Sequence, residues 1–256
     1  MRINRLKEKI RQGGCAIGTF MKLTDPAVAE ILALAGFDFF VLDNEHVAMD
    51  REQLTNIVRA AEACGITPIV RVKQNQQVEI LQNLDLGYAG IQVPNVDTPE
   101  QAEAMVASAK YTPQGVRGLS PSVRACDYGT ANVKEYIQMA NEQTMVISHC
   151  ETKECVENLD AILAVPGIDV IFIGPMDLSQ SLGIPGETGS PQVQECIRLV
   201  REKVAQSEKA LGTVAGSAKE AQKLKKEGVQ YILLASDQSM ILKWGKAALA
   251  EIREDD

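Results

Sequence analysis

The chain has 256 residues, of which 45% are hydrophobic and 23% charged, and its formal net charge is -8. This composition is typical of a folded globular protein, and the acidic balance disfavours nucleic acid or an anionic membrane surface as the main partner. No apolar run reaches the roughly 18 residues of a membrane helix. The charged start MRINRLKEKIRQGG also lacks the apolar core of a signal peptide. We therefore expect a cytoplasmic protein whose six scattered cysteines are reduced thiols.

The predicted elements alternate along the chain between short apolar strands and helices. Strands are expected at residues 15–23, 37–43, 67–72, 89–94, 144–151, 169–175, 211–216 and 229–236. Helices are expected at 25–35, 50–64, 76–86, 98–110, 132–141 and 237–254, with further helical stretches between the later strands. Residues 111–130 are rich in Gly, Pro and Ser and indicate a long loop.

Local signals support the helix boundaries. Asp25 and Asp50 precede helical segments as N-caps, Pro26 stands at a first helical position, and Gly36 and Gly65 follow helix ends. Short buried strands that alternate with helices imply a parallel sheet. Eight such units in a chain of this length predict a (β/α)8 TIM barrel, in a single α/β domain that spans residues 1–256. The alternative is an open doubly wound sheet, but no GxGxxG follows the first strand to support a dinucleotide fold.

Polar residues gather where the predicted strands end. In a barrel, catalytic groups come from the carboxyl ends of the strands, and the opposite ends of these strands offer nothing comparable. The residues concerned are Asp43, Glu45 and His46 after the second strand, Arg71 in the third, His149 and Glu151 in the fifth, and Asp177 after the sixth.

Glu151 and Asp177 follow neighbouring strands, so their carboxylates are expected to converge on one divalent cation. Oxygen ligands completed by water suit Mg²⁺ or Mn²⁺ and leave a position at which a substrate chelates the metal. For either residue alone, a helix N-cap or a solvated loop acid is the more common role.

The other rim residues have a catalytic and a structural interpretation each. His46 has a pKa range suited to proton transfer, and its acidic neighbours favour an oriented base over a structural hydrogen bonder. Arg71 is by default a salt-bridged rim residue, but beside a metal it would stabilise an enolate oxygen. In GPMD, the amides of Met176 and Asp177 would bind a carboxylate at a helix start, although Gly-Pro is also a common turn signal.

A Schiff-base lysine is the competing chemistry. Lys22 and Lys73 lie near strand ends, but neither is embedded in an apolar strand, as a lysine of lowered pKa would prefer. A cysteine nucleophile is disfavoured because Cys150 and His149 are adjacent in a strand and point to opposite faces.

Several segments, in this order, resemble the HpcH/HpaI aldolases, which are metal-dependent class II pyruvate aldolases with a barrel of the phosphoenolpyruvate/pyruvate type. They are DNEH at 43–46, PIVRV at 68–72, YTPQGVRG at 111–118, CET at 150–152 and FIGPMDLSQSLG at 172–183, and the likeness covers nearly the whole chain. The resemblance implies a carbon–carbon lyase of aromatic or sugar acid catabolism. Such an enzyme reversibly cleaves a 4-hydroxy-2-oxo acid to pyruvate and an aldehyde.

The resemblance also implies residue roles at the metal and the pyruvate. Glu151 and Asp177 match the ligands of a divalent metal, Mg²⁺, Mn²⁺ or Co²⁺. The amides of Met176 and Asp177 match those that hold the pyruvate carboxylate. Arg71 matches an arginine on the keto oxygen.

Further roles concern the other half of the substrate. His46 matches the base that acts on the 4-hydroxyl group, and Asp43 and Asp85 match acids that orient this machinery. Arg124, in the long loop, matches a residue that contacts the aldehyde half.

One residue departs from the family pattern. The family usually has glutamine two positions before the metal-binding glutamate, where this chain has His149. Strand alternation places His149 and Glu151 on the same face, toward the barrel interior. We expect His149 either to donate a hydrogen bond to pyruvate or to become a third metal ligand, which would favour Co²⁺ or Zn²⁺.

The resemblance further implies a homo-oligomer, a hexamer or trimer of dimers, in which barrels exchange their last helix. The segment from Gln238 to Arg253, with the only tryptophan, Trp244, fits that role, and packing on its own barrel fits the sequence equally well.

We therefore expect a metal-dependent aldolase acting on a small 2-oxo acid. One alternative is a different pyruvate-enolate reaction at the same site, either decarboxylation with carbon–carbon bond formation or a lyase reaction on an acyl-CoA. The other alternative is a barrel that only binds a ligand.

Overall fold

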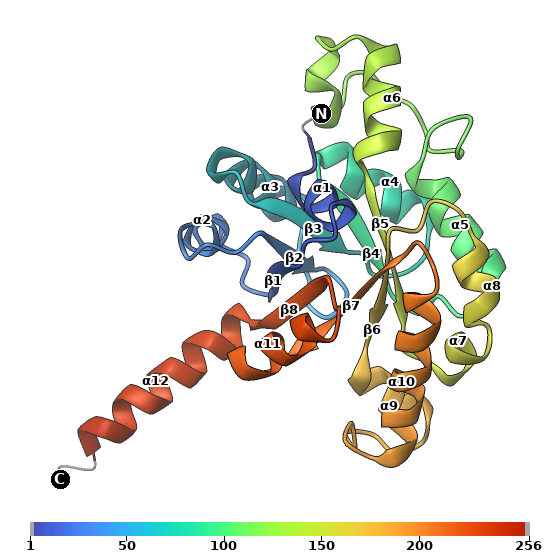
Figure 1. The fold of residues 1–256 in the computed structure, drawn as a ribbon. Coiled ribbons are helices and arrows are strands. Elements are labelled where there is room, and N and C mark those ends of the chain that lie inside the picture. The colour runs from blue at the N-terminus through green and yellow to red at the C-terminus, as the bar shows by residue number, and fades with distance from the viewer. Residues whose placement is uncertain (1–2, 254–256) are drawn as a thin grey trace.

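The structure, a computed structural model, describes residues 3–253. Eight parallel strands pair in chain order and close into a barrel, because β1 pairs with both β2 and β8. Helices surround this barrel (Figure 1). The strands are β1 (Ala16–Met21), β2 (Phe39–Asp43), β3 (Thr67–Arg71), β4 (Gly90–Val93), β5 (Met145–Cys150), β6 (Val170–Ile173), β7 (Ala210–Ala215) and β8 (Tyr231–Ser236). The predicted (β/α)8 barrel is confirmed.

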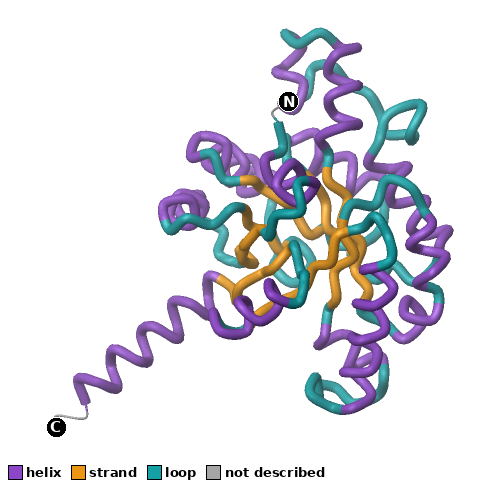
Figure 2. The backbone as a smooth tube through the Cα atoms, in the orientation of Figure 1, coloured by secondary structure: helices purple, strands orange, loops and turns teal. Residues whose placement is uncertain are grey.

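Between the strands, the chain forms helices that lie outside the sheet (Figure 2). They are α1 (Arg5–Arg11), α2 (Pro26–Leu34), α3 (Arg51–Cys64), α4 (Gln77–Leu86), α5 (Pro99–Ala109), the 3-10 helix η1 (Arg124–Gly129), α6 (Val133–Gln143), α7 (Lys153–Glu157), α8 (Leu159–Ala164), α9 (Pro175–Ser181), α10 (Pro191–Ala205), α11 (Ala218–Lys226) and α12 (Asp237–Arg253). The predicted loop 111–130 is irregular except for η1.

The predicted helix caps are present. The side chain of Asp25 accepts a hydrogen bond from the Ala27 amide at 2.8 Å, which satisfies one of the free amides of the first turn of α2. At the start of α3, Asp50 and Gln53 form a reciprocal capping box. Gly65 ends α3 with a φ of +78°, a left-handed conformation that glycine adopts without strain. Local sequence therefore determines these helix ends.

The core has two layers that follow the alternation of side chains along each strand. One layer fills the barrel and includes Phe39 and Val41 of β2 and Phe172 of β6, while the other lies between the strands and the helices. Gly18 of β1 faces the interior layer, and a Cβ atom there would lie 2.5 Å from the ring of Phe39. Because the inward series on β2 continues with Asp43, the same alternation places polar groups at the barrel mouth.

Helix α1 was not predicted, and it closes the amino-terminal end of the barrel. Leu6 and Ile10 are buried in the interior layer, and Lys7 Nζ donates to the carbonyl of Thr144, just before β5, at 2.9 Å. With seven residues and two apolar contacts, this helix has a weak periodic signal in a strongly charged segment.

Helix α12 extends away from the barrel (Figure 1). Asp237 at its start is the one buried residue of this helix. Its exposed apolar side chains are Ile241, Leu242, Trp244, Leu249 and Ile252. The predicted bounds agree with the structure, except that Glu254 lies outside the described residues. Within residues 3–253, no helix is both long and apolar enough to cross a bilayer.

Candidate active site at the carboxyl end of the barrel

The predicted strand-end residues share one mouth of the barrel because they continue the inward-facing series of their strands. Asp43 follows Phe39 and Val41 at a spacing of two, Arg71 follows Ile69, and both are the last residues of their strands. Residues 43 and 71 are register partners across β2 and β3. Period-two alternation, together with parallel pairing, therefore fixes both groups on the inside of the same rim.

Arg71 is held by two carboxylates and an aromatic ring. Its Nε donates to Asp43 Oδ1 at 3.0 Å and its Nη2 to Asp43 Oδ2 at 2.7 Å, while Nη1 lies 3.1 Å from Glu45 Oε2. The guanidinium carbon lies 4.8 Å from the centre of the Phe20 ring. A guanidinium has five N–H donors, so two remain to bind a substrate oxygen at this rim.

His46 lies at the edge of this group. Its side chain is 54% exposed, and its Nε2 lies 3.8 Å from Glu45 Oε2. Asp43 accepts a hydrogen bond from the backbone amide of His46 at 3.2 Å. Asp43 therefore shapes the loop and anchors Arg71, and Glu45 is the acid beside the imidazole. The exposed ring is free to meet a substrate at the mouth.

The Asp43 carboxylate is fully buried. Burial alone would raise its pKa, but the hydrogen bonds and charge of Arg71 outweigh this and lower the pKa to about 2. Asp43 is thus ionised at neutral pH.

A pH dependence of stability follows from this shift. Because the folded-state pKa is depressed from 3.8 to about 2, ionised Asp43 adds about 2 kcal/mol of stability above its ordinary pKa. Roughly half of this is lost by pH 3 and the rest as the pH falls through about 2. Urea unfolding at pH 7 and pH 3 should show a larger loss in the wild-type protein than in Asp43→Asn. Equal losses would contradict the assignment.

Glu151 and His149 form the second polar group of the mouth. The Nδ1 atom of His149 lies 2.6 Å from Glu151 Oε2, and its Nε2 lies 2.6 Å from Gln92 Nε2. Tyr231 donates through its hydroxyl to Gln92 Oε1 at 2.9 Å. Since the amide nitrogen of Gln92 only donates, Nε2 of His149 accepts and its Nδ1–H donates to Glu151. The predicted common face of His149 and Glu151 is confirmed.

This chain of contacts bears on the expected roles of His149. Both ring nitrogens are engaged, one by Glu151 and the other by Gln92, and the ring is stacked 4.8 Å from the Phe172 ring, centre to centre. In this conformation neither nitrogen is free to bind a metal or pyruvate directly. His149 thus orients the carboxylate of Glu151, and its expected roles at pyruvate or at a metal stay predictions.

Glu151 is buried and ionised. Burial would raise its pKa, but the electrostatic interaction and hydrogen bond with His149 and the hydrogen bond from the Asn95 amide lower the pKa below its usual value. The Asn95 amide donates to Oε1 at 3.0 Å. A Cβ atom at position 174 would lie 2.6 Å from Glu151 Oε2, so the glycine of the GPMD sequence makes the space that this carboxylate occupies.

Gly174 also begins the segment that contains Asp177. It is the N-cap of α9, with Pro175 at the first position, and no side chain caps the helix. Met176 and Asp177 lie in the first turn and are exposed. Their amides are thus among those that an α-helix leaves without an internal partner.

The two carboxylates fit the oxygen-rich coordination of a hard divalent cation. Glu151 is ionised and Asp177 is exposed on the adjoining segment, so water and a chelating substrate would complete the coordination. In residues 3–253 no group of three or more His, Cys, Asp or Glu side chains is arranged to hold a metal. Carboxylate and water oxygens are ligands that Mg²⁺ and Mn²⁺ accept.

Asp85 and Arg124 are not brought to this mouth within one chain. Asp85 lies in the last turn of α4, before β4, and accepts from Arg117 at 2.8 Å. Arg124 pairs with Glu62 and donates to the Leu86 carbonyl at 2.8 Å. Both lie toward the amino-terminal end of the barrel, where a cavity of about 760 Å³ is lined in part by Arg124. Their expected roles stay predictions.

Sequence reasoning did not single out Gln92, Asn95, Tyr231 or Asp237. Gln92 had a detectable signal, because it is a polar residue inside the apolar strand β4 and at an inward position. Asn95 contributes only its backbone amide, and Tyr231 lies at the start of an apolar strand. The sequence alone carries no indication of these two contacts.

Comparison with known proteins identifies relatives over nearly the whole chain. A profile of the HpcH/HpaI aldolase/citrate lyase family matches residues 16–243. The chain is 36% identical to hydroxypyruvate/pyruvate aldolase of Pseudomonas aeruginosa, over 94% of this chain and 90% of that one. It is 35% identical to 5-keto-4-deoxy-D-glucarate aldolase of Escherichia coli (strain K12 / DH10B), over 91% of each. The structure of citrate synthase SbnG, 37% identical, superposes with a TM-score of 0.90 over 98% of both chains.

Both curated relatives are named as aldolases, which make and break carbon–carbon bonds. The prediction of a carbon–carbon lyase is therefore confirmed.

Proposed function

The chain belongs to the HpcH/HpaI aldolase/citrate lyase family, and from this premise we propose that it is a metal-dependent aldolase. It would reversibly cleave a 4-hydroxy-2-oxo acid into pyruvate and an aldehyde through an enolate. The observation that carries the proposal is the buried, ionised Glu151, oriented by His149 and the Asn95 amide beside the first turn of α9.

In this proposal Glu151 and Asp177 hold the cation, which supplies positive charge next to the 2-oxo acid. The amides of Met176 and Asp177 bind the carboxylate of the substrate. Arg71 uses its two remaining N–H donors on the keto oxygen and stabilises the negative charge that develops there. Asp43 and Glu45 fix the guanidinium in place before the substrate arrives.

His46 acts at the other end of the bond that breaks. It accepts the proton of the 4-hydroxyl group, and the C3–C4 bond breaks as the C4 carbonyl of the aldehyde forms. The electron pair passes into the C2–C3 enolate, whose oxygen Arg71 stabilises. A proton from water then reaches C3 and yields pyruvate, and His46 returns its own proton to water. The exposed imidazole beside Glu45 suits this role.

Replacing His46 with alanine should impair cleavage of the carbon–carbon bond and leave pyruvate binding intact. We expect release of pyruvate from a 4-hydroxy-2-oxo acid to slow by roughly 10²-fold or more, because the general base is lost. Pyruvate binding should persist, because Arg71 and α9 are untouched. The measurements are stopped-flow detection of pyruvate release and calorimetric titration with pyruvate. Near-wild-type cleavage in His46→Ala would remove His46 from the mechanism.

The similarity to citrate synthase SbnG over 98% of both chains favours a second candidate function. That function is condensation of an acyl-CoA with a 2-oxo acid at the same site. Two assays on one preparation distinguish the functions: release of pyruvate from 4-hydroxy-2-oxo acids, and release of free thiol from acetyl-CoA with oxaloacetate. Metal-dependent pyruvate release without thiol release supports the aldolase. The reverse pattern would replace it with the condensation.

We also propose that the functional form is a homo-oligomer, a hexamer or trimer of dimers, in which α12 docks on another barrel. The exposed apolar side chains along α12 support this proposal. Asp85 and Arg124 lie near the end of the barrel opposite the proposed site, so a role in catalysis requires that this end of one subunit faces the mouth of another.

A further inference from the structure

A buried chain of hydrogen bonds crosses the barrel interior and ends at Glu151. It begins with the Tyr231 hydroxyl on β8, which donates to Gln92 Oε1 on β4 at 2.9 Å. Gln92 Nε2 lies 2.6 Å from His149 Nε2, and His149 Nδ1 lies 2.6 Å from Glu151 Oε2. Because β4 and β8 are four strands apart in a barrel of eight, Tyr231 reaches Gln92 from the opposite wall. We refer to Tyr231, Gln92 and His149 as the interior relay.

The interior relay is closed off from solvent. Its three side chains belong to residues that are at most 1% exposed. The Phe172 ring stacks on His149 at 4.8 Å between centres and meets the Tyr231 ring edge-on at 5.9 Å. The Phe39 ring lies 4.4 Å from the Tyr231 ring, centre to centre. In such an apolar interior, water does not replace a lost partner, so each hydrogen bond of the relay constrains the next.

The relay favours one tautomer of His149. Because Tyr231 donates to Gln92 Oε1, the amide of Gln92 turns its Nε2 toward the histidine, and this nitrogen only donates. A proton on His149 Nε2 would face that N–H group at 2.6 Å and is disfavoured. The ring therefore carries its proton on Nδ1, where it donates to Glu151. In the opposite tautomer, the lone pair of an unprotonated Nδ1 would face the carboxylate.

The position of this proton bears on the metal site. An imidazole nitrogen that carries no proton is a common metal ligand, and Nδ1 of His149 lies beside Glu151, the proposed ligand of the cation. Imidazole nitrogen suits Zn²⁺, whereas carboxylate and water oxygens suit Mg²⁺ and Mn²⁺. A proton held on Nδ1 therefore excludes the nitrogen that would attract Zn²⁺.

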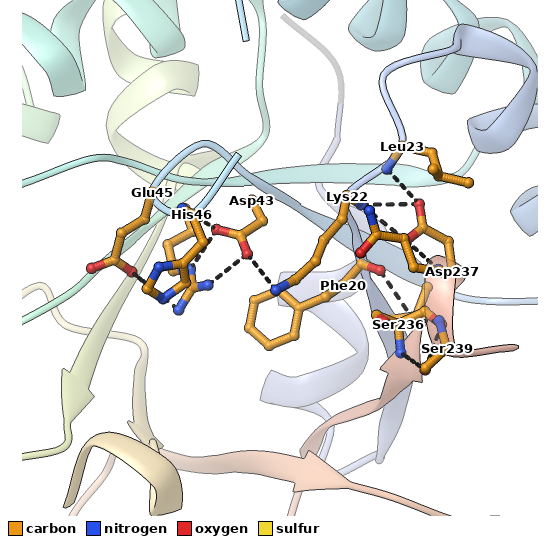
Figure 3. A network of polar contacts seen from close by, with 12 residues as sticks. Phe20, Lys22, Leu23, Asp43, Glu45, His46, Ser236, Asp237 and Ser239 are labelled. Atoms are coloured by element: carbon orange, nitrogen blue, oxygen red, sulfur yellow. Dashed lines mark hydrogen bonds and ion pairs between the residues drawn. The ribbon is translucent and has the colours of Figure 1, made fainter. Parts of the chain in front are cut away.

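The interior relay is separate from the other polar network of the mouth. In that network, Asp43 binds Lys22, and the imidazole of His46 lies beside Glu45 (Figure 3). None of these four side chains belongs to the relay. Variants of the relay therefore leave in place the groups that the proposed mechanism uses at the 4-hydroxyl group.

We propose that Tyr231 and Gln92 are positioning residues that hold His149 in its Nδ1–H tautomer, which keeps the ring out of the metal site and makes the site select Mg²⁺ or Mn²⁺ over Zn²⁺. Groups behind a metal ligand commonly fix the proton and the orientation of the groups in front of them. The inference rests on the proposed metal site at Glu151 and adds its metal selectivity.

Two variants test the relay. Gln92→Met removes the donor to His149, and the double variant Tyr231→Phe/Gln92→Met also removes the hydroxyl that would otherwise lose its partner. The control is Tyr88→Phe, which deletes the buried hydroxyl that donates to the Leu54 carbonyl at 2.9 Å, in the layer between strands and helices.

Three quantities are measured on each protein. Electron paramagnetic resonance gives the Mn²⁺ affinity. Displacement of bound Mn²⁺ at buffered free Zn²⁺ gives the Zn²⁺ affinity of the same site, so that binding to a thiol elsewhere does not contribute. The chain has only two histidines, so ¹⁵N NMR of the metal-free protein, with His46→Ala for assignment, reports the tautomer of His149.

In the metal-free wild-type protein, His149 should be protonated at Nδ1 alone. In both relay variants the proton should shift toward Nε2. The ratio of Zn²⁺ to Mn²⁺ affinity should then rise roughly 10- to 100-fold, the usual effect of a partner behind a metal ligand. Tyr88→Phe should change neither the tautomer nor the ratio.

A proton on Nε2 of His149 in the wild-type protein, or an unchanged affinity ratio in both relay variants, would overturn the inference. An equal loss of affinity for both metals would do so too, because the relay would then only support the structure. In each case the wild-type protein still binds Mn²⁺ and releases pyruvate, and the proposed aldolase function stands. Mn²⁺ binding by the wild-type protein no tighter than by Glu151→Gln would overturn the proposed metal site and this inference together.

Discussion

Replacing Glu151 with glutamine is expected to reduce kcat/KM for pyruvate release by roughly 10³-fold or more, because a carboxylate ligand supplies several kcal/mol of charge stabilisation. Glutamine has nearly the same shape and still accepts the hydrogen bond that the Asn95 amide donates at 3.0 Å. The substitution thus keeps the shape and removes the charge together with the oxygen that contacts His149 Nδ1. Steady-state kinetics and Mn²⁺ titration by electron paramagnetic resonance measure the two effects.

The matched control is Glu154→Gln, which neutralises an exposed glutamate in α7, close to Glu151 in sequence. It should leave both the kinetics and Mn²⁺ affinity unchanged. Equal losses in the two variants would indicate a nonspecific effect of charge. Wild-type Mn²⁺ affinity in Glu151→Gln would exclude Glu151 as a metal ligand.

Replacing Arg71 with lysine keeps the positive charge but removes the planar, forked arrangement of N–H donors. A lysine cannot reproduce the paired bonds to the two oxygens of Asp43 at 3.0 and 2.7 Å together with the contact to Glu45. We expect kcat/KM to fall by roughly 10²- to 10³-fold, the usual cost of one lost oxyanion donor. The free energy of unfolding should fall by about 1–3 kcal/mol, since the buried Asp43 loses hydrogen bonds.

Arg59→Lys is the control for this change, because Arg59 is exposed on α3 and donates only to Asn56 among residues 3–253. It should affect neither activity nor stability. If Arg71→Lys lost stability but kept its activity, Arg71 would be a structural residue and the enolate oxygen would need another donor.

The barrel could be predicted from the sequence because its signals are local. Each strand is a short apolar run, and helix ends are marked by capping residues such as Asp50 and Gly65. Helix α1 was not found because its stability comes from contacts with distant segments, such as the bond from Lys7 to Thr144. A seven-residue helix has little intrinsic stability of its own.

The site could also be predicted in part, because the position of a residue in its strand is a local signal. Strand-end positions placed Asp43 and Arg71 at the mouth, strand alternation placed His149 on the inner face, and the structure agrees. The partner of each group could not be predicted, because partners come from neighbouring strands and loops. In the structure the side chain of Asp43 binds Arg71 and Lys22, whereas the sequence had suggested that it supports His46. The His149 contact with Gln92 joins residues 57 positions apart in the chain.

The measurement that tests the central claim most directly is exchange of the pyruvate methyl protons in D₂O, followed by NMR. The protein is first stripped of metal, and Mg²⁺, Mn²⁺, Co²⁺ or Zn²⁺ is then added back. Enolate formation at Glu151 and Asp177 predicts exchange only with metal, and fastest with Mg²⁺ or Mn²⁺ because both His149 nitrogens are engaged within the protein. Equally fast exchange without metal would contradict this account and point to a lysine-dependent route.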